Sequence, residues 1–153
     1  MDKIKWCFKK GMEIVKPNSN LADAYLKKSE DSLESMRLIT SKDWKISMAY
    51  YSMYFGLYSV LMKIGIKSEI HSCSIEIMKL FLLEYFDEDD VNLIEESFKA
   101  RIDAQYYTNR DVNDVIYEDI LSKVSEFVVK CKSIILKLNE NDVEKIRDLI
   151  KNK

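Results

Sequence analysis

Turn-forming residues are scarce in this chain. Its 153 residues include three glycines and one proline. Sheet-rich folds need such residues at frequent intervals, so their scarcity favours long helices joined by few connections. Apolar residues recur at helical spacing, most regularly at Ile120, Val124, Phe127, Cys131, Ile134 and Leu138. Because no strand-like alternation persists, the sequence predicts an all-α fold.

The predicted architecture is an antiparallel bundle of four long helices with short additional helices at the termini. We expect one domain over residues 1–153. Within it we place an N-terminal helix in residues 1–17, a core bundle in residues 20–138 and a C-terminal helix in residues 141–153.

Polar residues and one glycine mark the expected ends of these helices. Asn20 is a candidate cap for the first core helix, and Ser41 or Asp43 for the central one. Gly65 follows the central helix as a left-handed stop. A third core helix is expected over residues 72–85.

Overall charge and cysteine spacing exclude several classes of protein. The net charge is −2, so no global field attracts nucleic acid, although a local site stays possible. Cys7, Cys73 and Cys131 are far apart in sequence, whereas zinc and redox motifs place cysteines close together. We predict reduced, buried thiols, no disulfide and no structural metal.

The uncharged segment from residue 46 to residue 62 is too short to span a membrane, which takes roughly 20 apolar residues. It contains three serines and four tyrosines, which suit a central core helix. The N-terminus lacks the features of a signal peptide. We expect a cytoplasmic protein without a membrane partner.

No motif for a cofactor is present, because the three glycines are scattered and His71 is the single histidine. Clustered carboxylates leave two interpretations open, a magnesium site or capping of neighbouring helices. These residues are Glu84, Asp87, Glu88, Asp89 and Asp90. We predict no cofactor.

Tyr50, Tyr54 and Tyr58 form a column at four-residue spacing on the predicted central helix. Tyrosine combines a large apolar ring with a hydroxyl group, so such a column suits a helix face that is partly exposed to solvent. The column is a candidate dimer interface; core packing and a nucleotide pocket are the alternatives. His71 is expected to lie in a loop or cap and to bond the backbone.

The segment "ARIDAQYYTNRD" concentrates polar and aromatic residues at the end of a predicted helix. The candidate ligand-binding residues are Arg101, Asp103, Tyr106, Tyr107 and Arg110, and the candidate catalytic residues are Arg101 and Tyr106. Arginine binds phosphate through its planar fork of donors.

Several segments in this order resemble the HEPN superfamily, in particular its small stand-alone archaeal and bacterial members. The central helix "AYYSMYFGLYSVLMKIG" resembles the second helix of that family. "GIKSEIHS" with "IEIMKLFLLEYF", "EESFKARIDAQYY" and "ILSKVSEFVVKCKSIILKL" continue the likeness. The resemblance covers about residues 20 to 138.

The resemblance implies a helical bundle that commonly forms dimers and, in many members, cuts RNA without metal. Those members use an arginine followed after four to six residues by a histidine. Arg101 matches the arginine, but Tyr106, Tyr107 and Thr108 stand at the histidine positions. Histidine transfers protons near neutral pH, whereas tyrosine ordinarily titrates near pH 10.

Arg101 and Tyr106 also point roughly 140° apart on a straight helix, so they converge only at a helix end or in a dimer. Arg101 therefore has three possible roles: a salt bridge with Asp103 or a neighbouring helix, a phosphate-binding site, or catalysis. The leading hypothesis is a degenerate, non-catalytic HEPN-like homodimer. The resemblance implies a nucleotidyltransferase partner in a toxin–antitoxin or defence pair, with RNA or a nucleotide as ligand. The alternatives are a metal-independent endoribonuclease and a purely structural interaction protein.

Overall fold

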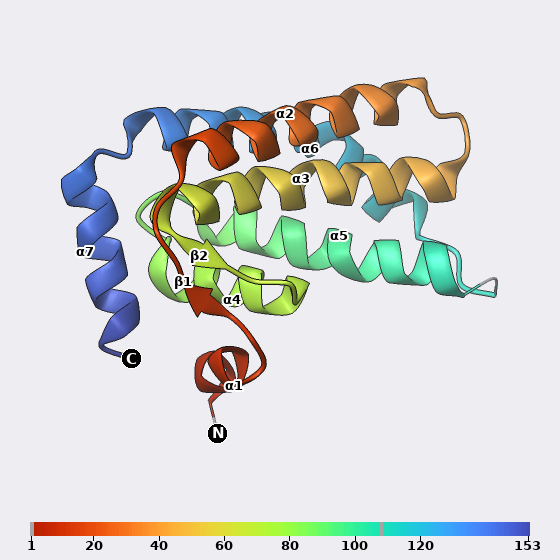
Figure 1. Ribbon diagram of the computed structural model, residues 1–153. Helices are drawn as coiled ribbons and strands as arrows, with labels where there is room; N and C mark the ends of the chain where they lie inside the picture. The colour runs from red at the N-terminus through yellow and green to blue at the C-terminus, as the bar shows by residue number, and fades with distance from the viewer. Residues whose placement is uncertain (1, 108) are drawn as a thin grey trace.

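The computed structural model describes residues 2–107 and 109–153, and in those ranges the chain forms seven helices and one two-stranded sheet. The elements are α1 (Lys3–Lys9), β1 (Glu13–Ile14), α2 (Ser19–Leu38), α3 (Lys42–Ile64), β2 (Ile66–Lys67), α4 (His71–Phe81), α5 (Glu88–Tyr106), α6 (Asp114–Lys137) and α7 (Glu140–Lys151). The four longest, α2, α3, α5 and α6, build the bundle (Figure 1). The predicted all-α fold class is confirmed.

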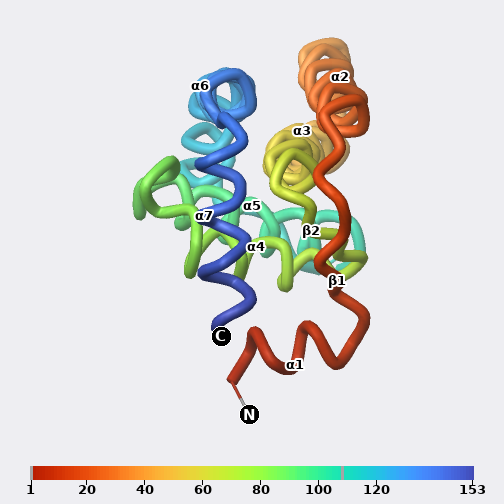
Figure 2. The backbone as a smooth tube through the Cα atoms, turned by 60° about the vertical axis from the view of Figure 1, so that its left-hand side comes forward, coloured from red at the N-terminus to blue at the C-terminus, as the bar shows by residue number. Residues whose placement is uncertain are grey.

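Helix α3 is the centre of the molecule. Helices α2, α5 and α6 surround it, and the view in Figure 2 shows α3 between α2 and α6 above and α5 below. Most of its side chains are buried. A helix that is apolar nearly all round is stable in water only when other helices cover it. The uncharged segment is therefore a core helix, as predicted.

The ends of α3 follow the sequence, while other boundaries differ. The Ser41 side chain accepts the Trp44 amide at the N-terminus of α3, and Gly65 ends it with φ 83°. Both agree with the prediction. At α2, however, Asn18 is the cap, because its side chain accepts the Leu21 amide; the prediction of Asn20 was wrong.

Two predicted helices are shorter than expected. The N-terminal helix ends at Lys9, because Gly11 turns the chain with φ 116° and leads it into β1. Helix α4 ends at Phe81 rather than at residue 85. The segment between α4 and α5 then forms turns before Asp87 caps α5.

A small antiparallel sheet ties the N-terminal segment to the end of α3. Glu13 pairs with Lys67 and Ile14 with Ile66. Arg147 of α7 secures this junction, because its Nη1 donates to the carbonyl oxygens of residues 15, 64 and 65 at 2.7, 2.9 and 3.2 Å. The sequence did not predict these strands, since each has only two residues.

A disulfide joins Cys7 of α1 to Cys73 of α4, 66 residues later in the chain, and Cys131 is a free, buried thiol. The prediction of no disulfide was therefore wrong. The absence of a short cysteine motif argues against a metal site, but it says nothing about cysteines that packing brings together. Here α1 packs against α4 and places the two sulfur atoms side by side.

Within residues 2–107 and 109–153, no helix combines the length and the apolar character needed to cross a bilayer.

Candidate functional site

Arg101 lies on the inward face of α5 with only 9% of its surface exposed. Its Nη1 donates to the Tyr51 hydroxyl at 2.9 Å and to the Gln105 side-chain oxygen at 3.2 Å. Its guanidinium carbon lies 5.3 Å from the ring centre of Tyr50 and 5.7 Å from that of Phe98. The guanidinium group is therefore surrounded by aromatic rings, and its hydrogen-bond acceptors are uncharged oxygen atoms.

No carboxylate neutralises this arginine in the described part of the chain, and its buried Nε has no hydrogen-bond acceptor there. The predicted salt bridge of Arg101 was wrong. Asp103 pairs instead with Arg110, at 3.3 Å. A buried cation without an anion is costly, because desolvation removes water and nothing replaces its charge. Such a group is a strong candidate for binding an anionic ligand.

The fold brings His71 into the cluster around Arg101. His71 is the first residue of α4, and its Nδ1 lies 2.8 Å from the Tyr50 hydroxyl. Its ring stacks on Tyr54 with 3.9 Å between centres. The expectation that this histidine bonds the backbone was wrong. Tyr50 therefore connects two residues, Arg101 and His71, that lie 30 positions apart.

Burial controls the proton chemistry of this cluster. Desolvation, with a smaller contribution from the positive charge of Arg101, lowers the pKa of His71 from 6.5 to about 4. Burial raises the pKa of Tyr50 above its ordinary value and that of Tyr54 to about 12. At neutral pH these three side chains are uncharged, and Arg101 is the charged member of the group.

The tyrosine column is buried inside the single chain. Tyr54 bonds the Ser74 hydroxyl at 2.9 Å, and Tyr58 accepts the Ser68 amide at 3.1 Å. Tyr50, Tyr54 and Tyr58 are each exposed by less than a tenth. They belong to the core and do not offer their rings to a second subunit, so their assignment as interface residues was wrong.

The remaining predicted site residues gather at the end of α5. The Arg110 guanidinium carbon lies 3.8 Å from the ring centre of Tyr107, and Arg110 also pairs with Asp103. Tyr106 ends the helix and is exposed, and its hydroxyl is not among the hydrogen-bond partners of Arg101. Thr108, the third of the histidine positions, lies outside the described residues. The segment therefore divides into a buried Arg101 and an exposed group around Arg110.

Two of the clustered carboxylates, Asp87 and Asp90, cap α5. Asp87 accepts the Asp90 amide and Asp90 accepts the Asp87 amide, which is a capping box. Lys130 of α6 lies 2.6 Å from Asp90. The Asp90 amide lowers the pKa of Asp87, and Lys130 adds to this effect. Across the two described ranges, no group of three or more histidine, cysteine or acidic side chains is placed to hold a metal ion.

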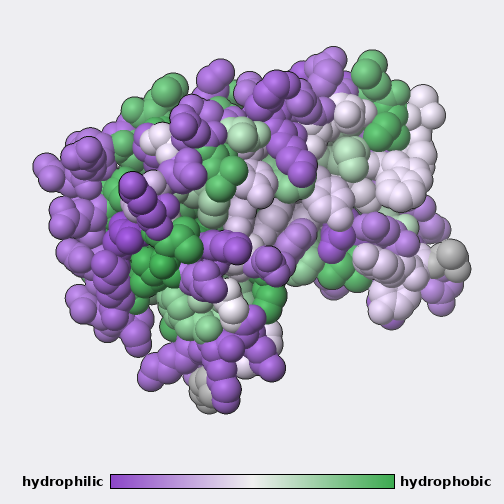
Figure 3. Space-filling model, in the orientation of Figure 1, coloured by the Kyte–Doolittle hydropathy of each residue, from purple (hydrophilic) through white to green (hydrophobic). Residues whose placement is uncertain are grey.

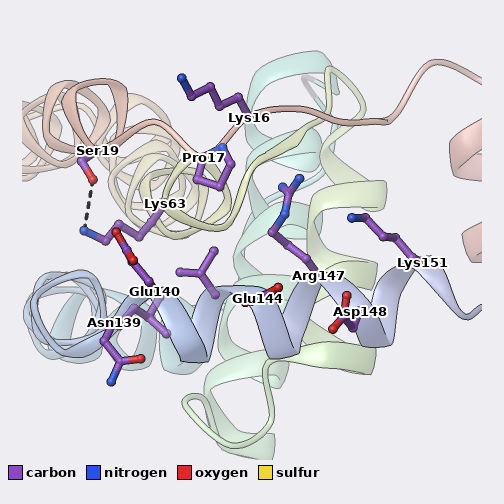
Figure 4. Close-up of a pocket in the computed structure, with 12 residues that line it drawn as sticks. Lys16, Pro17, Ser19, Lys63, Asn139, Glu140, Glu144, Arg147, Asp148 and Lys151 are labelled. Carbon is purple, nitrogen blue, oxygen red and sulfur yellow. Dashed lines mark hydrogen bonds between the residues drawn. The ribbon is translucent and has the colours of Figure 1, made fainter.

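A hollow of about 530 Å³ lies against α7, and Arg101 is not among the residues that line it (Figure 4). Acidic side chains of α7 line it together with lysines, and Lys63 donates to Ser19 at 3.2 Å. Its cations and carboxylates are mixed, and Arg147, which also lines it, is engaged by backbone carbonyls. None of the predicted site residues contributes to this hollow, so its size does not identify the functional site.

Some neighbours of Arg101 could be predicted from the sequence. Phe98 and Gln105 lie three residues before it and four after it, which places all three on one face of a helix. Tyr51 and His71 come from other helices, and no local pattern connects them to Arg101.

The HEPN domain model matches residues 20–134 of the chain. The chain belongs to the HEPN family. It is also 31% identical over 129 residues to "Putative toxin MJ0142" of Methanocaldococcus jannaschii, an alignment that covers 76% of this chain and 86% of that protein. The matched domain includes Arg101 and His71. It does not include α1, β1 or α7.

Proposed function

We propose that this HEPN protein is a dimeric, non-catalytic binding module of a toxin–antitoxin or defence pair, and that Arg101 binds a phosphate group of RNA. The toxin named among its relatives supports the class of system. A nucleotidyltransferase is the partner that the family resemblance suggests. The proposal requires no metal and no cofactor.

The observation that carries this proposal is the uncompensated charge of Arg101. The guanidinium is buried, its Nη1 is held by Tyr51 and Gln105, and its Nε–H has no acceptor within the described residues. Two fixed hydrogen bonds orient the group without neutralising it. A phosphate group supplies the missing negative charge.

The same cluster is poorly suited to cleaving RNA. A general base works best with a pKa near the ambient pH. His71 has a pKa of about 4, its Nδ1 is engaged by Tyr50, and its ring is stacked on Tyr54. At neutral pH it has little tendency to take up a proton, so the arrangement favours binding over catalysis.

Metal-independent endoribonuclease activity is the second candidate. The observation that favours it is the histidine in the Arg101 cluster, which the sequence motif alone did not indicate. In that mechanism Arg101 stabilises the phosphate while His71 moves a proton. Both candidates use the same arginine and differ in whether the RNA stays intact.

The test is incubation of the purified protein with labelled single-stranded RNA in the presence of chelator. We expect binding, measured by fluorescence anisotropy, and intact RNA on a denaturing gel. Arg101→Met should weaken binding about tenfold or more, because a hydrogen bond to a charged group is lost. The dependence of affinity on salt should also decrease by about one phosphate contact.

Arg37→Met is the matched control, since Arg37 is an exposed arginine on α2 that pairs with Glu34. It removes the same charge and should leave affinity nearly unchanged. Arg101→Met should alter the free energy of unfolding by no more than about 1 kcal/mol, because an uncompensated buried charge is removed with its hydrogen bonds. RNA cleavage by the wild type that disappears in Arg101→Met would establish the second candidate instead.

A further inference from the structure

A row of aromatic rings continues from Arg101 across one face of the molecule. Tyr51 lies beside the guanidinium, 5.4 Å from its carbon to the ring centre. Phe55, one helical turn along α3, stacks on Tyr51 at 5.9 Å with 21° between the planes. Tyr25 of α2 stacks on Phe55 at 6.1 Å and 26°. All three rings, here called the ring row, are half-buried and so remain partly accessible.

The ring row carries positive charge along its length. Lys28 of α2 places its Nζ 4.6 Å from the ring centre of Phe55, and Arg101 lies at the Tyr51 end. Neither cation forms an ion pair with a carboxylate of the described chain, whereas the adjacent Lys27 pairs with Asp31 at 3.1 Å. The two cations next to the rings are therefore available to an anion.

The surface view agrees with this arrangement. Figure 3 shows pale and green side chains across the middle of the face, over α3, with purple, hydrophilic side chains above and below them. The ring row consists of residues from α2 and α3, which lie side by side in both ribbon and tube views (Figures 1 and 2). An accessible aromatic surface with flanking cations is the usual composition of a single-strand binding site.

We propose that the ring row, with Lys28 and Arg101, binds consecutive nucleotides of single-stranded RNA, the bases stacking on the rings and the phosphates contacting the two cations. This inference rests on the proposed function of Arg101 and extends it to the neighbouring nucleotides. Stacking uses the π-face that every base has, so recognition depends little on sequence. Lys28 is long and flexible, and it moves from the ring to a phosphate when a base takes its place.

A second copy of the chain fits this face less well. A symmetric dimer places the same surface of both copies in contact, and it would bring Lys28 and Arg101, neither of which has an ion-pair partner among the described residues, towards their counterparts. What the ring row lacks is negative charge, and a nucleic-acid strand supplies negative charge together with stacking partners.

The experiment compares two probes, labelled oligoadenylate and inorganic polyphosphate, which has phosphates but no bases. We expect Phe55→Leu to weaken oligoadenylate binding about tenfold through lost stacking. The same substitution should leave polyphosphate binding unchanged. Lys28→Ala should weaken both and reduce the salt slope by about one.

Matched controls exist in the chain. Tyr117→Leu removes another half-buried ring that has a lysine above it, Lys42 at 5.1 Å, and Lys27→Ala removes the neighbouring charge on α2. Neither should change the affinity for oligoadenylate. Phe55→Trp retains a stacking ring and should bind at least as tightly as the wild type, which separates loss of stacking from misfolding.

The outcomes distinguish this inference from the proposed function. If Phe55→Leu binds oligoadenylate as tightly as the wild type while Arg101→Met does not, the ring row does not bind bases and the proposed phosphate site at Arg101 is retained. If the wild type binds neither probe, the ring-row inference and the proposed function are both wrong. If Phe55→Leu converts a dimer into a monomer without altering RNA affinity, the ring row is a contact between copies and the inference is overturned.

Discussion

At the scale of single residues, the candidate site combines features that the sequence could and could not reveal. Arg101 was identified from the sequence, because it lies in the segment "ARIDAQYYTNRD" and matches the arginine of the motif in the HEPN family that the chain resembles. Its partner Tyr51 and the nearby His71 were not visible as neighbours, since they lie 50 and 30 residues away. Such contacts depend on how helices pack, and local periodicity carries no information about this.

The single histidine allows a direct measurement at this scale. The His71 signal should titrate with a pKa of about 4 in NMR spectra, far below the ordinary 6.5. In Arg101→Met the pKa should move upward, because a nearby positive charge is removed. Exposure of the ring to water, and hence a value near 6.5 in the wild type, would contradict the buried cluster.

The same shift links stability to pH. The pKa of His71 is lower in the folded state than in the unfolded state, so its neutral form favours folding. This stabilisation is fully present above pH 6.5 and is lost as the pH falls towards 4. Urea denaturation at several pH values should show a smaller loss over this interval in His71→Phe, which keeps a ring against Tyr54 but cannot titrate.

At the scale of elements, helix α1 is the part that sequence reasoning described least well. It was expected as a longer helix, and it is a short one joined to α4 by the Cys7–Cys73 disulfide. Both cysteines are fully buried. Helix α1 lies outside the region matched by the HEPN domain model. Its attachment therefore adds a restraint to α4, the helix that begins with His71.

Removing this disulfide should lower stability strongly. A cross-link between residues this far apart restricts the unfolded chain, and its loss costs about 4 kcal/mol. The double variant Cys7→Ala/Cys73→Ala should therefore unfold at lower urea concentration than the oxidised wild type. Dithiothreitol should destabilise the wild type but leave the double variant unchanged, which serves as the control. Equal stability of the oxidised wild type and the double variant would show that the cross-link contributes nothing.

At the scale of the whole molecule, the helical bundle was predictable and its assembly was not. The long helices follow from apolar spacing and from scarce glycine and proline, because helices are set by local sequence. The proposed dimer now has a different basis, since the Tyr50 column is internal. Three exposed apolar residues lie on the outer side of α6, Val115, Val129 and Leu136, which are exposed by 77%, 63% and 77%, and the polar Ser122 stands midway between the first two.

We therefore expect a homodimer that uses this side of α6, because exposed apolar side chains on one helix face are buried when that face packs against its own copy. Light scattering of the wild type should give twice the chain mass of 18.0 kDa at micromolar concentration. Val129→Glu places a charge among these exposed apolar residues and should yield monomers with unchanged helix content. Leu83→Glu, which alters an exposed leucine outside α6, should remain dimeric. A wild type that is monomeric at high concentration would remove the dimer from the proposed function, while leaving the phosphate site of Arg101 intact.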